Sequence, residues 1–259
     1  MRKPIPIAAA LGVLLWCAAP STAQWLNRKT PGIPRTADGK VNMTAPAPRT
    51  ADGKPDLTGI WDPDPKFVRD LAVNLKPGEV RMQPWAEKLY NERKTGALSG
   101  EEPDANCLPQ GVPKIDAAPA PWKVMEFPGV IVILYEAFSG YRQIFTDGRP
   151  LPEDPNPTWF GYSVGKWDGD TLVVDTIGFN GKLWLDQLGH PSSDALHVIE
   201  RYRRKDFGHM NIEVTIDDPK AYTKPWTVIE DPHYLADTDL LEFECNENNR
   251  DVPHLPDAK

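Results

Sequence analysis

The sequence has little cysteine, little histidine and no excess of basic residues. Its 259 residues include 3 cysteines and 5 histidines, and 29 Lys and Arg stand against 37 Asp and Glu, which gives a formal net charge of −8. An acidic chain lacks the basic footprint that nucleic acids and anionic lipids require, so we expect neither as a partner. Because the histidines have no His-x-His or His-Glu-x-x-His spacing, we predict no metal and no cofactor.

Long apolar runs are absent after the first 23 residues. Residues 1–23 have a short basic start, an apolar stretch too short to span a bilayer, and the small residues Ser21-Thr22-Ala23 before the expected cleavage point. We therefore predict a signal peptide over residues 1–23 and a periplasmic or secreted chain without a membrane span. Cleavage leaves 259 − 23 = 236 residues and, since Arg2 and Lys3 are lost, a net charge of −10.

Cleavage also removes Cys17 and leaves Cys107 and Cys245. Two cysteines in an exported chain most simply form one disulfide. We predict that this bridge ties an early loop to the last strand. The alternative is a pair of buried free thiols.

The segment after the signal peptide is rich in proline and polar residues. Residues 24–56 contain the heptapeptide PRTADGK twice, at 34–40 and 48–54, and hold nothing that could build a core. We predict a disordered tether over residues 24–56, a single β domain over 57–250 and a tail over 251–259.

The clearest strand signal is TWFGYSVGKWDGDTLVVDTIGFN, residues 158–180. Its Asp168-Gly169 dipeptide suits a two-residue type I′ turn, which would place Ser163 opposite Val174. One helix is expected, from Pro84 to Lys94. Further strands are expected at 59–61, 122–127, 130–138, 141–146, 196–203, 209–217, 226–230 and 239–245. About nine or ten strands separated by turn signals predict an all-β fold, an antiparallel up-and-down β-barrel with one short N-terminal helix and long loops.

Strand alternation places two opposite charges on apolar faces of the predicted sheet. If Arg203 pairs with His209 across the turn, Glu200 shares a face with Val198 and Tyr202. Arg142 shares a face with Ile144 on its own strand. A buried carboxylate needs a partner or a raised pKa, so we expect Arg142 to pair with Glu200. Such a pair is either a functional site or a structural ion pair.

Asp186 and His190 lie four residues apart in a loop over residues 181–194. A carboxylate at this spacing can orient an imidazole for acid–base catalysis, and a serine such as Ser192 would complete a hydrolase triad. Ser192 lacks the Gly-x-Ser-x-Gly context of such nucleophiles. A histidine that caps backbone is the structural alternative, and a metal site of His190, His197 and Asp186 is less favoured.

Two resemblances follow from the motifs of this sequence. Gly59-Ile60-Trp61 resembles the opening of lipocalin-type proteins, where the tryptophan closes one barrel end, and implies a lipocalin-like barrel. The motifs RQIFTDGRPLP, GYSVGKWDGDTLVVDT, GHP, ERYRR and FECNEN resemble those of a group of exported bacterial proteins of unknown function, over most of residues 55–248. This second resemblance implies a single domain and transfers no catalytic residue.

Three functions remain open, and the sequence does not decide whether the protein is an enzyme. The first is a barrel that holds a small, largely apolar ligand oriented by the internal Arg142 and Glu200 pair. The candidate ligand-binding residues are Arg142, His197, Glu200, Arg201 and Tyr202. The second is a periplasmic hydrolase, lyase or isomerase with His190, Asp186 and Glu200 as catalytic residues. The third is an envelope interaction module that uses an exposed sheet face, which would leave the interior filled and these polar residues on the outside.

Overall fold

The structure is a computed structural model that describes residues 29–247. The predicted signal peptide and the predicted tail over residues 251–259 lie outside this range. Within it, none of the helices has the length and apolar content that crossing a bilayer requires.

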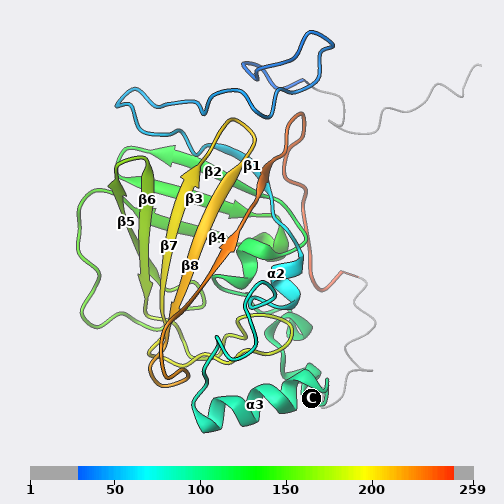
Figure 1. Ribbon diagram of the computed structural model, residues 1–259, viewed down its shortest axis with the longest axis vertical. Helices are drawn as coiled ribbons and strands as arrows, with labels where there is room; N and C mark the ends of the chain where they lie inside the picture. Colours follow the sequence, from blue (N-terminus) through cyan, green and yellow to red (C-terminus); the bar gives the residue numbers. More distant parts are fainter. Residues whose placement is uncertain (1–28, 248–259) are drawn as a thin grey trace, which may run out of the picture.

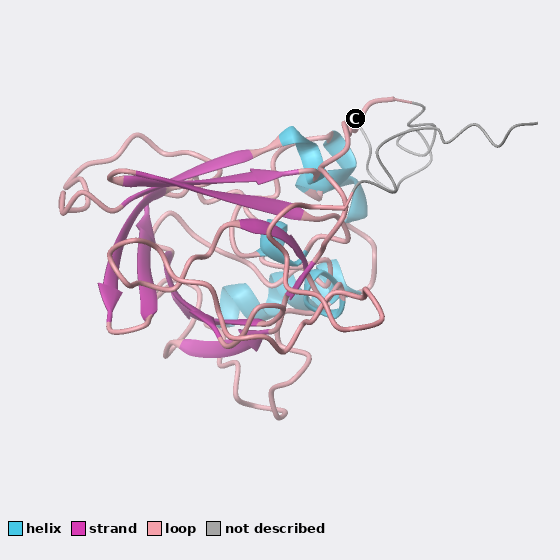
Figure 2. Ribbon diagram, turned by 90° about the horizontal axis from the view of Figure 1, so that it is seen from above, coloured by secondary structure: helices cyan, strands magenta, loops and turns pink. Residues whose placement is uncertain are grey.

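One ten-stranded sheet curls into a half-barrel (Figures 1 and 2). The strands are β1 Gly59–Asp62, β2 Trp122–Phe127, β3 Val130–Tyr135, β4 Tyr141–Phe145, β5 Tyr162–Asp168, β6 Thr171–Ile177, β7 His197–Arg204, β8 Met210–Asp217, β9 Trp226–Glu230 and β10 His233–Tyr234. They lie in the order β10-β1-β2-β3-β4-β5-β6-β7-β8-β9, so most strands that follow each other in the chain are neighbours in the sheet. The prediction of a mainly β fold is confirmed.

Every pairing in the sheet is antiparallel except that of β4 with β5. These two strands run parallel and pair only at Ile144 with Ser163 and at Phe145 with Val164. The cause is the long connection over residues 146–161, which carries the chain to the other end of the sheet before β5 begins. The strict up-and-down topology is therefore not confirmed, and the parallel pair corrects it.

The two edges of the half-barrel meet at one end. β9 is followed by β10, which pairs with β1, while His233 bridges His209 and the Tyr234 N–H donates to the Gly208 carbonyl at 2.8 Å. The predicted last strand over residues 239–245 is not a strand. The short β10 takes its place and pairs with the edge of β1 at Trp61 and Asp62.

The hairpin of β5 and β6 differs from the prediction at its turn. The two turn residues are Gly169 and Asp170 rather than Asp168 and Gly169. Gly169 has a φ of +59°, and the first position of a type II′ turn favours glycine. Ser163 therefore pairs with Thr176, two residues beyond the predicted partner, and the predicted side-chain faces are unchanged.

The inner face of the half-barrel carries the core. Trp61 of β1 and Trp122 of β2 are fully buried, with ring centroids 6.4 Å apart. Alternate strand residues point to the same face, so one set of side chains fills the interior. Buried apolar members of this set include Ile131, Ile133, Ile144, Leu172, Val174, Val198, Ile212, Val214, Ile216 and Val228.

Helices and loops fill the open side of the half-barrel (Figure 2). α3, Pro84–Lys94, is the predicted helix and has proline in its first turn, where a backbone N–H is not needed. α2, Lys66–Arg69, is a single turn that was not predicted, and it buries Phe67 and Val68. Short 3₁₀ segments complete this layer: η1 Ser99–Glu101, η2 Pro103–Asn106, η3 Lys114–Ala117 and η4 Ala137–Ser139.

The two copies of PRTADGK form matching hydrogen-bonded loops, which corrects the predicted disordered tether. In each copy the threonine N–H donates to the lysine carbonyl, at 2.8 and 2.9 Å, and the arginine side chain donates to the glycine carbonyl. Arg35 then pairs with Asp237, and Arg49 pairs with Asp170. The composition suggested disorder because the segment has few core-forming residues. The turn hydrogen bonds and the distant acidic partners that order it form only in the folded chain.

Candidate functional site

Arg142 of β4 and Glu200 of β7 meet inside the half-barrel, as predicted. Arg142 Nη1 donates to Glu200 Oε1 at 2.9 Å and Nη2 donates to Oε2, so the two groups form a bidentate pair. Arg142 is 2% exposed and Glu200 is 0% exposed. Arg203 pairs with Asn211 across β7 and β8, two residues from the predicted partner, and this even shift keeps Glu200 inside.

Neighbouring strands surround this pair with hydroxyl groups. Arg142 Nε donates to Ser163 Oγ at 3.1 Å, and Nη2 donates to Thr176 Oγ1 at 2.8 Å. The Tyr202 hydroxyl donates to Glu200 Oε1 at 2.7 Å. These contacts engage Nε and both Nη groups of the guanidinium, so the ion pair is well solvated by protein groups.

A second carboxyl group, that of Asp116 in η3, lies beside the pair. Asp116 Oδ2 is 3.9 Å from Arg142 Nη1, and the Tyr135 hydroxyl donates to Oδ1 at 2.6 Å. Oδ2 is buried and has no hydrogen-bond partner among the described residues. Burial and then the Glu200 carboxylate raise the pKa of Asp116 to about 7. Two carboxyl groups in such a site share a proton more readily than they both ionise.

Glu230 of β9 supplies a third buried carboxyl group. It is 3% exposed, and its Oε1 has no hydrogen-bond partner among the residues that the structure describes. Burial and then the charges of Asp116 and Glu200 raise the pKa of Glu230 well above its usual range. We call Asp116, Arg142, Glu200 and Glu230 the buried charge cluster. The cluster holds three carboxyl groups and one guanidinium, so one cation faces up to three negative charges. Protonation of a carboxyl group in the cluster is therefore favoured.

Two members of the cluster, Asp116 and Glu230, were not predicted from the sequence. Glu230 alternates with Trp226 and Val228 on β9, and all three are buried. The same parity argument that found Glu200 would therefore have found Glu230. Asp116 lies in a 3₁₀ turn outside the sheet, where no periodic pattern marks the buried side.

His197 and Arg201 do not join the cluster. They alternate with the buried positions of β7 and lie on its outer face, where His197 Nε2 is 3.0 Å from Asp175 Oδ1 and Arg201 Nη2 donates to Asp168 at 3.1 Å. The two-residue period of a strand therefore places them on the face of β7 opposite Glu200, and their role in ligand binding stays a prediction.

His190 and Asp186 form a separate pair beside α3. His190 Nδ1 is 2.5 Å from Asp186 Oδ2, and the backbone N–H groups of Leu71, Gly189 and His190 donate to the same carboxylate at 2.9, 2.9 and 3.1 Å. Asp186 is 0% exposed. The carboxylate therefore anchors the loop over residues 181–194 to the segment that follows α2.

The surroundings of His190 are closed. Tyr90 of α3 stacks on the imidazole with ring centroids 4.3 Å apart, Trp226 lies 5.7 Å away, and His190 is 3% exposed. Ser192 Oγ donates to a backbone carbonyl at 2.9 Å rather than to His190. Within the described chain no hydrogen bond or ion pair joins His190 to Glu200, so the predicted catalytic residues fall in two places.

Asp70 forms a group of metal-binding residue types with Asp186 and His190. Their ligand atoms lie within 4.8 Å of one another. Asp186 already accepts three backbone N–H groups, and Asp70 Oδ1 accepts the N–H of Ala72 at 3.0 Å. These bonds account for the arrangement as a loop anchor. The alternative metal site with His197 is not formed, since His197 lies on the outer face of β7.

A pocket of about 550 Å³ opens where β4 and β5 diverge. The two strands separate on the N-terminal side of their two paired positions, which leaves room between their backbones. Six aromatic side chains line the pocket: Phe138, Tyr141, Phe145, Trp159, Phe160 and Tyr162. The other lining residues are Pro109, Ser139, Gly140, Arg142, Gln143, Thr158, Gly161 and Ser163. We call this space the β4–β5 pocket.

The β4–β5 pocket runs from the surface to the edge of the buried charge cluster. Arg142 and Ser163, each 2% exposed, are its buried lining residues, whereas Tyr141 is 65% exposed. Phe138 and Ser139 at its rim have φ angles of 58° and 48°, in the left-handed region that side chains other than glycine rarely adopt. Backbone outliers of this kind concentrate at functional sites.

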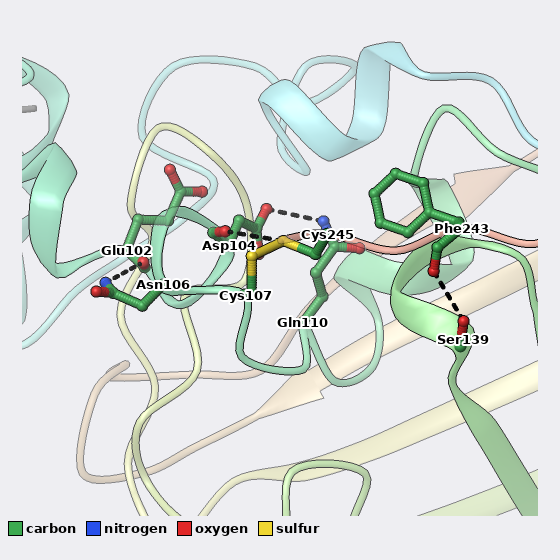
Figure 3. Close-up of a disulfide and its surroundings, with 8 residues drawn as sticks. All are labelled: Glu102, Asp104, Asn106, Cys107, Gln110, Ser139, Phe243 and Cys245. Carbon is green, nitrogen blue, oxygen red and sulfur yellow. Dashed lines mark hydrogen bonds between the residues drawn. A yellow bond between two sulfur atoms is a disulfide. The ribbon is translucent and has the colours of Figure 1, made fainter. Parts of the chain in front are cut away.

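The predicted disulfide between Cys107 and Cys245 is confirmed, with a Cα–Cα distance of 5.5 Å (Figure 3). It holds the C-terminal segment against the rim of the pocket. The Phe243 ring lies 5.7 Å from that of Phe138, and Ser139 Oγ donates to the Phe243 carbonyl at 2.9 Å. The bridge thus supports two residues that line the β4–β5 pocket.

A scan against protein-family models and a search of curated proteins both found no match to this chain. The function is therefore inferred from the geometry of the site.

Proposed function

We propose that this protein is an exported, lipocalin-like β-barrel protein that binds a small, largely apolar molecule in the β4–β5 pocket. The observation that supports this function is a half-open pocket with six aromatic side chains, none of them fully buried, which ends at buried Arg142 and Ser163. Its volume of about 550 Å³ falls within the 300–1,000 Å³ of small-molecule sites, which are mostly apolar with a few polar groups.

The aromatic lining favours a ligand that contains a ring. Water against aromatic surface is unfavourable, and a ligand ring that covers this surface gains both burial and the ring contact itself. Stacked or edge-to-face contacts contribute about 0.5–1.5 kcal/mol each beyond the area buried. Six such side chains are more than one small ring can contact, so several orientations of the ring are open to a ligand.

The pair of Arg142 and Glu200 supports the pocket from behind. Glu200 is not among the lining residues, and Nε and both Nη groups of Arg142 already bind Ser163, Glu200 and Thr176. We infer that the pair orients the ligand by fixing the position of Ser163 and of β4. A ligand that took Glu200 away from Arg142 would leave a buried charge without its partner, which is strongly unfavourable.

The charge and the disulfide agree with an exported small-molecule binder. A net charge of −8 disfavours nucleic acid as a partner, and a disulfide between distant segments fits an oxidising compartment. We therefore propose a periplasmic or secreted location.

The other two functions have less support. An enzyme that used His190 and Asp186 would have to expose an imidazole that Tyr90 and Trp226 cover. An interaction module was expected to carry Arg142 and Glu200 on its outside, and both are buried.

Binding of N-phenyl-1-naphthylamine, a neutral dye that fluoresces in apolar sites, tests the proposed function. We expect saturable binding to the full chain that Tyr141→Ala and Trp159→Ala each weaken about tenfold, which corresponds to about 1.4 kcal/mol. Phe127→Ala is the matched control, because Phe127 is an aromatic residue with 52% exposure that does not line the pocket. Absence of saturable binding, or equal affinity in all three variants, would show the proposal to be wrong.

A further inference from the structure

A second pocket, of about 400 Å³, adjoins the β4–β5 pocket. The two pockets share Phe145, Tyr162 and Ser163. The rest of the second pocket comes from Val164 of β5 and from the loop after β4, residues 149–153. Because three residues line both spaces, the pockets are neighbours along the junction of β4 with β5, and we call the two pockets together the groove.

We propose that this groove binds a neutral oligosaccharide, with successive sugar rings in the β4–β5 pocket and in the second pocket. The inference rests on the proposed function, because the first ring occupies the β4–β5 pocket. In the β4–β5 pocket the sugar presents its apolar C–H face to the aromatic side chains, and its hydroxyl groups make polar contacts in the second pocket.

The walls of the groove match the two kinds of surface on a sugar ring. A pyranose has a face of C–H groups, which packs on flat side chains, and an edge of hydroxyl groups, each of which both donates and accepts hydrogen bonds. Tyr162, whose side chain carries both a ring and a hydroxyl, lines both pockets. The Arg149 guanidinium lies 3.9 Å from the centroid of the Phe145 ring, so a planar group with N–H donors extends the aromatic wall.

The polar groups of the second pocket have free hydrogen-bonding capacity of both kinds. Asp147 accepts from Nε and Nη2 of Arg149, at distances from 2.6 to 3.0 Å, and Nη1 makes no hydrogen bond with the described residues. The exposed Glu153 carboxylate likewise makes no hydrogen bond or ion pair within residues 29–247. The hydroxyl groups of a sugar suit both, since a hydroxyl can accept from Arg149 and can donate to Glu153.

The balance of charge favours a neutral ligand. An anionic ligand would meet Glu153 in the second pocket and, beside it, the Asp147 carboxylate that pairs with Arg149. A cationic ligand would meet Arg149 there and Arg142 at the inner end of the groove. A purely apolar ligand would bury the free donor and acceptor of the second pocket without partners, which is unfavourable.

Calorimetric titration of the full chain tests this inference. The probes are cellotetraose, xylotetraose, mannotetraose, maltotetraose and chitotetraose, each compared with its monosaccharide. We expect one tetrasaccharide to bind at least about tenfold more tightly than its monosaccharide, because it gains the contacts of a second ring. Arg149→Ala and Glu153→Ala should each remove this gain, and Glu153→Ala should leave dye binding unchanged, since Glu153 lies outside the β4–β5 pocket.

Two exposed residues outside both pockets supply matched controls. Arg203→Ala removes a positive charge from the outer face of β7, and Asp154→Ala removes a negative charge from the position next to Glu153. The inference is overturned, and the proposed function stands, if the dye binds while none of the tetrasaccharides does, or if the Arg149 and Glu153 variants behave like these controls. If neither dye nor sugar binds, the proposed function is wrong and the inference falls with it.

Discussion

Replacement of Asp116 by asparagine is expected to make the stability of this protein less dependent on pH. In the folded chain, burial and then Glu200 raise the pKa of Asp116 from 3.8 to about 7. In the unfolded chain the group titrates at its usual value of about 3.9. Between these values the folded state holds a proton that the unfolded state has released, so the free energy of unfolding falls as pH rises.

The expected size of the effect follows from the difference between the two pKa values. It is about 7 − 3.8, or roughly three units, and one unit corresponds to about 1.36 kcal/mol. The native chain therefore loses of order 4 kcal/mol of stability between about pH 4 and pH 7 through this group. Asp116→Asn has nearly the same volume, stays neutral and keeps a donor that can reach Glu200. Its stability relative to the native chain is expected to rise by of order 4 kcal/mol over this range.

Urea unfolding followed by tryptophan fluorescence, at intervals from pH 4.5 to 8.5 with the disulfide intact, measures this difference. Subtracting the native curve from the variant curve cancels the groups that titrate alike in both chains. Asp154→Asn is the control, since it removes an exposed carboxyl group that lies outside the buried charge cluster. A difference between Asp116→Asn and the native chain that stays flat, or falls with pH, would refute the assignment of a shared proton to Asp116 and Glu200.

Two further predictions concern the supports of the half-barrel. Arg142→Met should lower the free energy of unfolding by about 3–5 kcal/mol, because it leaves Glu200 buried without its cation, and Glu200→Gln should restore much of that loss. Denaturation of the two single variants and the double variant measures this coupling, and strictly additive losses would contradict the reasoning. Serine at both Cys107 and Cys245 should lower the free energy of unfolding by about 3–5 kcal/mol, since the bridge joins residues 138 apart in sequence. A loss below about 1 kcal/mol would show that the C-terminal segment contributes little to folding.

The inside of the half-barrel could be predicted from the sequence because side-chain direction in a strand is local. The predicted residue pairing was wrong in two hairpins: Ser163 pairs with Thr176, and Arg203 pairs with Asn211. Each error was a shift of two residues along one strand, and a two-residue shift leaves every side chain on its face. Glu200 was therefore placed inside correctly although its hairpin register was wrong.

The features that the sequence could not predict depend on contacts between distant segments. Asp116 joins the buried charge cluster from a 3₁₀ turn, and its side chain has no periodic neighbours to indicate its direction. The repeats near the N-terminus are fixed by Arg35 with Asp237 and by Arg49 with Asp170, pairs separated by more than a hundred residues. Composition describes local hydrophobicity and carries no record of such partners.

The parallel junction of β4 with β5 lies at the candidate site. Alternation and turn signals predicted a regular antiparallel order, and the parallel pairing in the described sheet lies where the connection over residues 146–161 crosses the sheet. Two paired positions cannot hold the strands together along their length, so the strands diverge and leave space that aromatic side chains line without filling. An antiparallel hairpin in the same place would have paired along its length and closed the groove. The interruption of the regular pattern is therefore what creates the groove, and it explains why strand patterning alone gave no sign of its position.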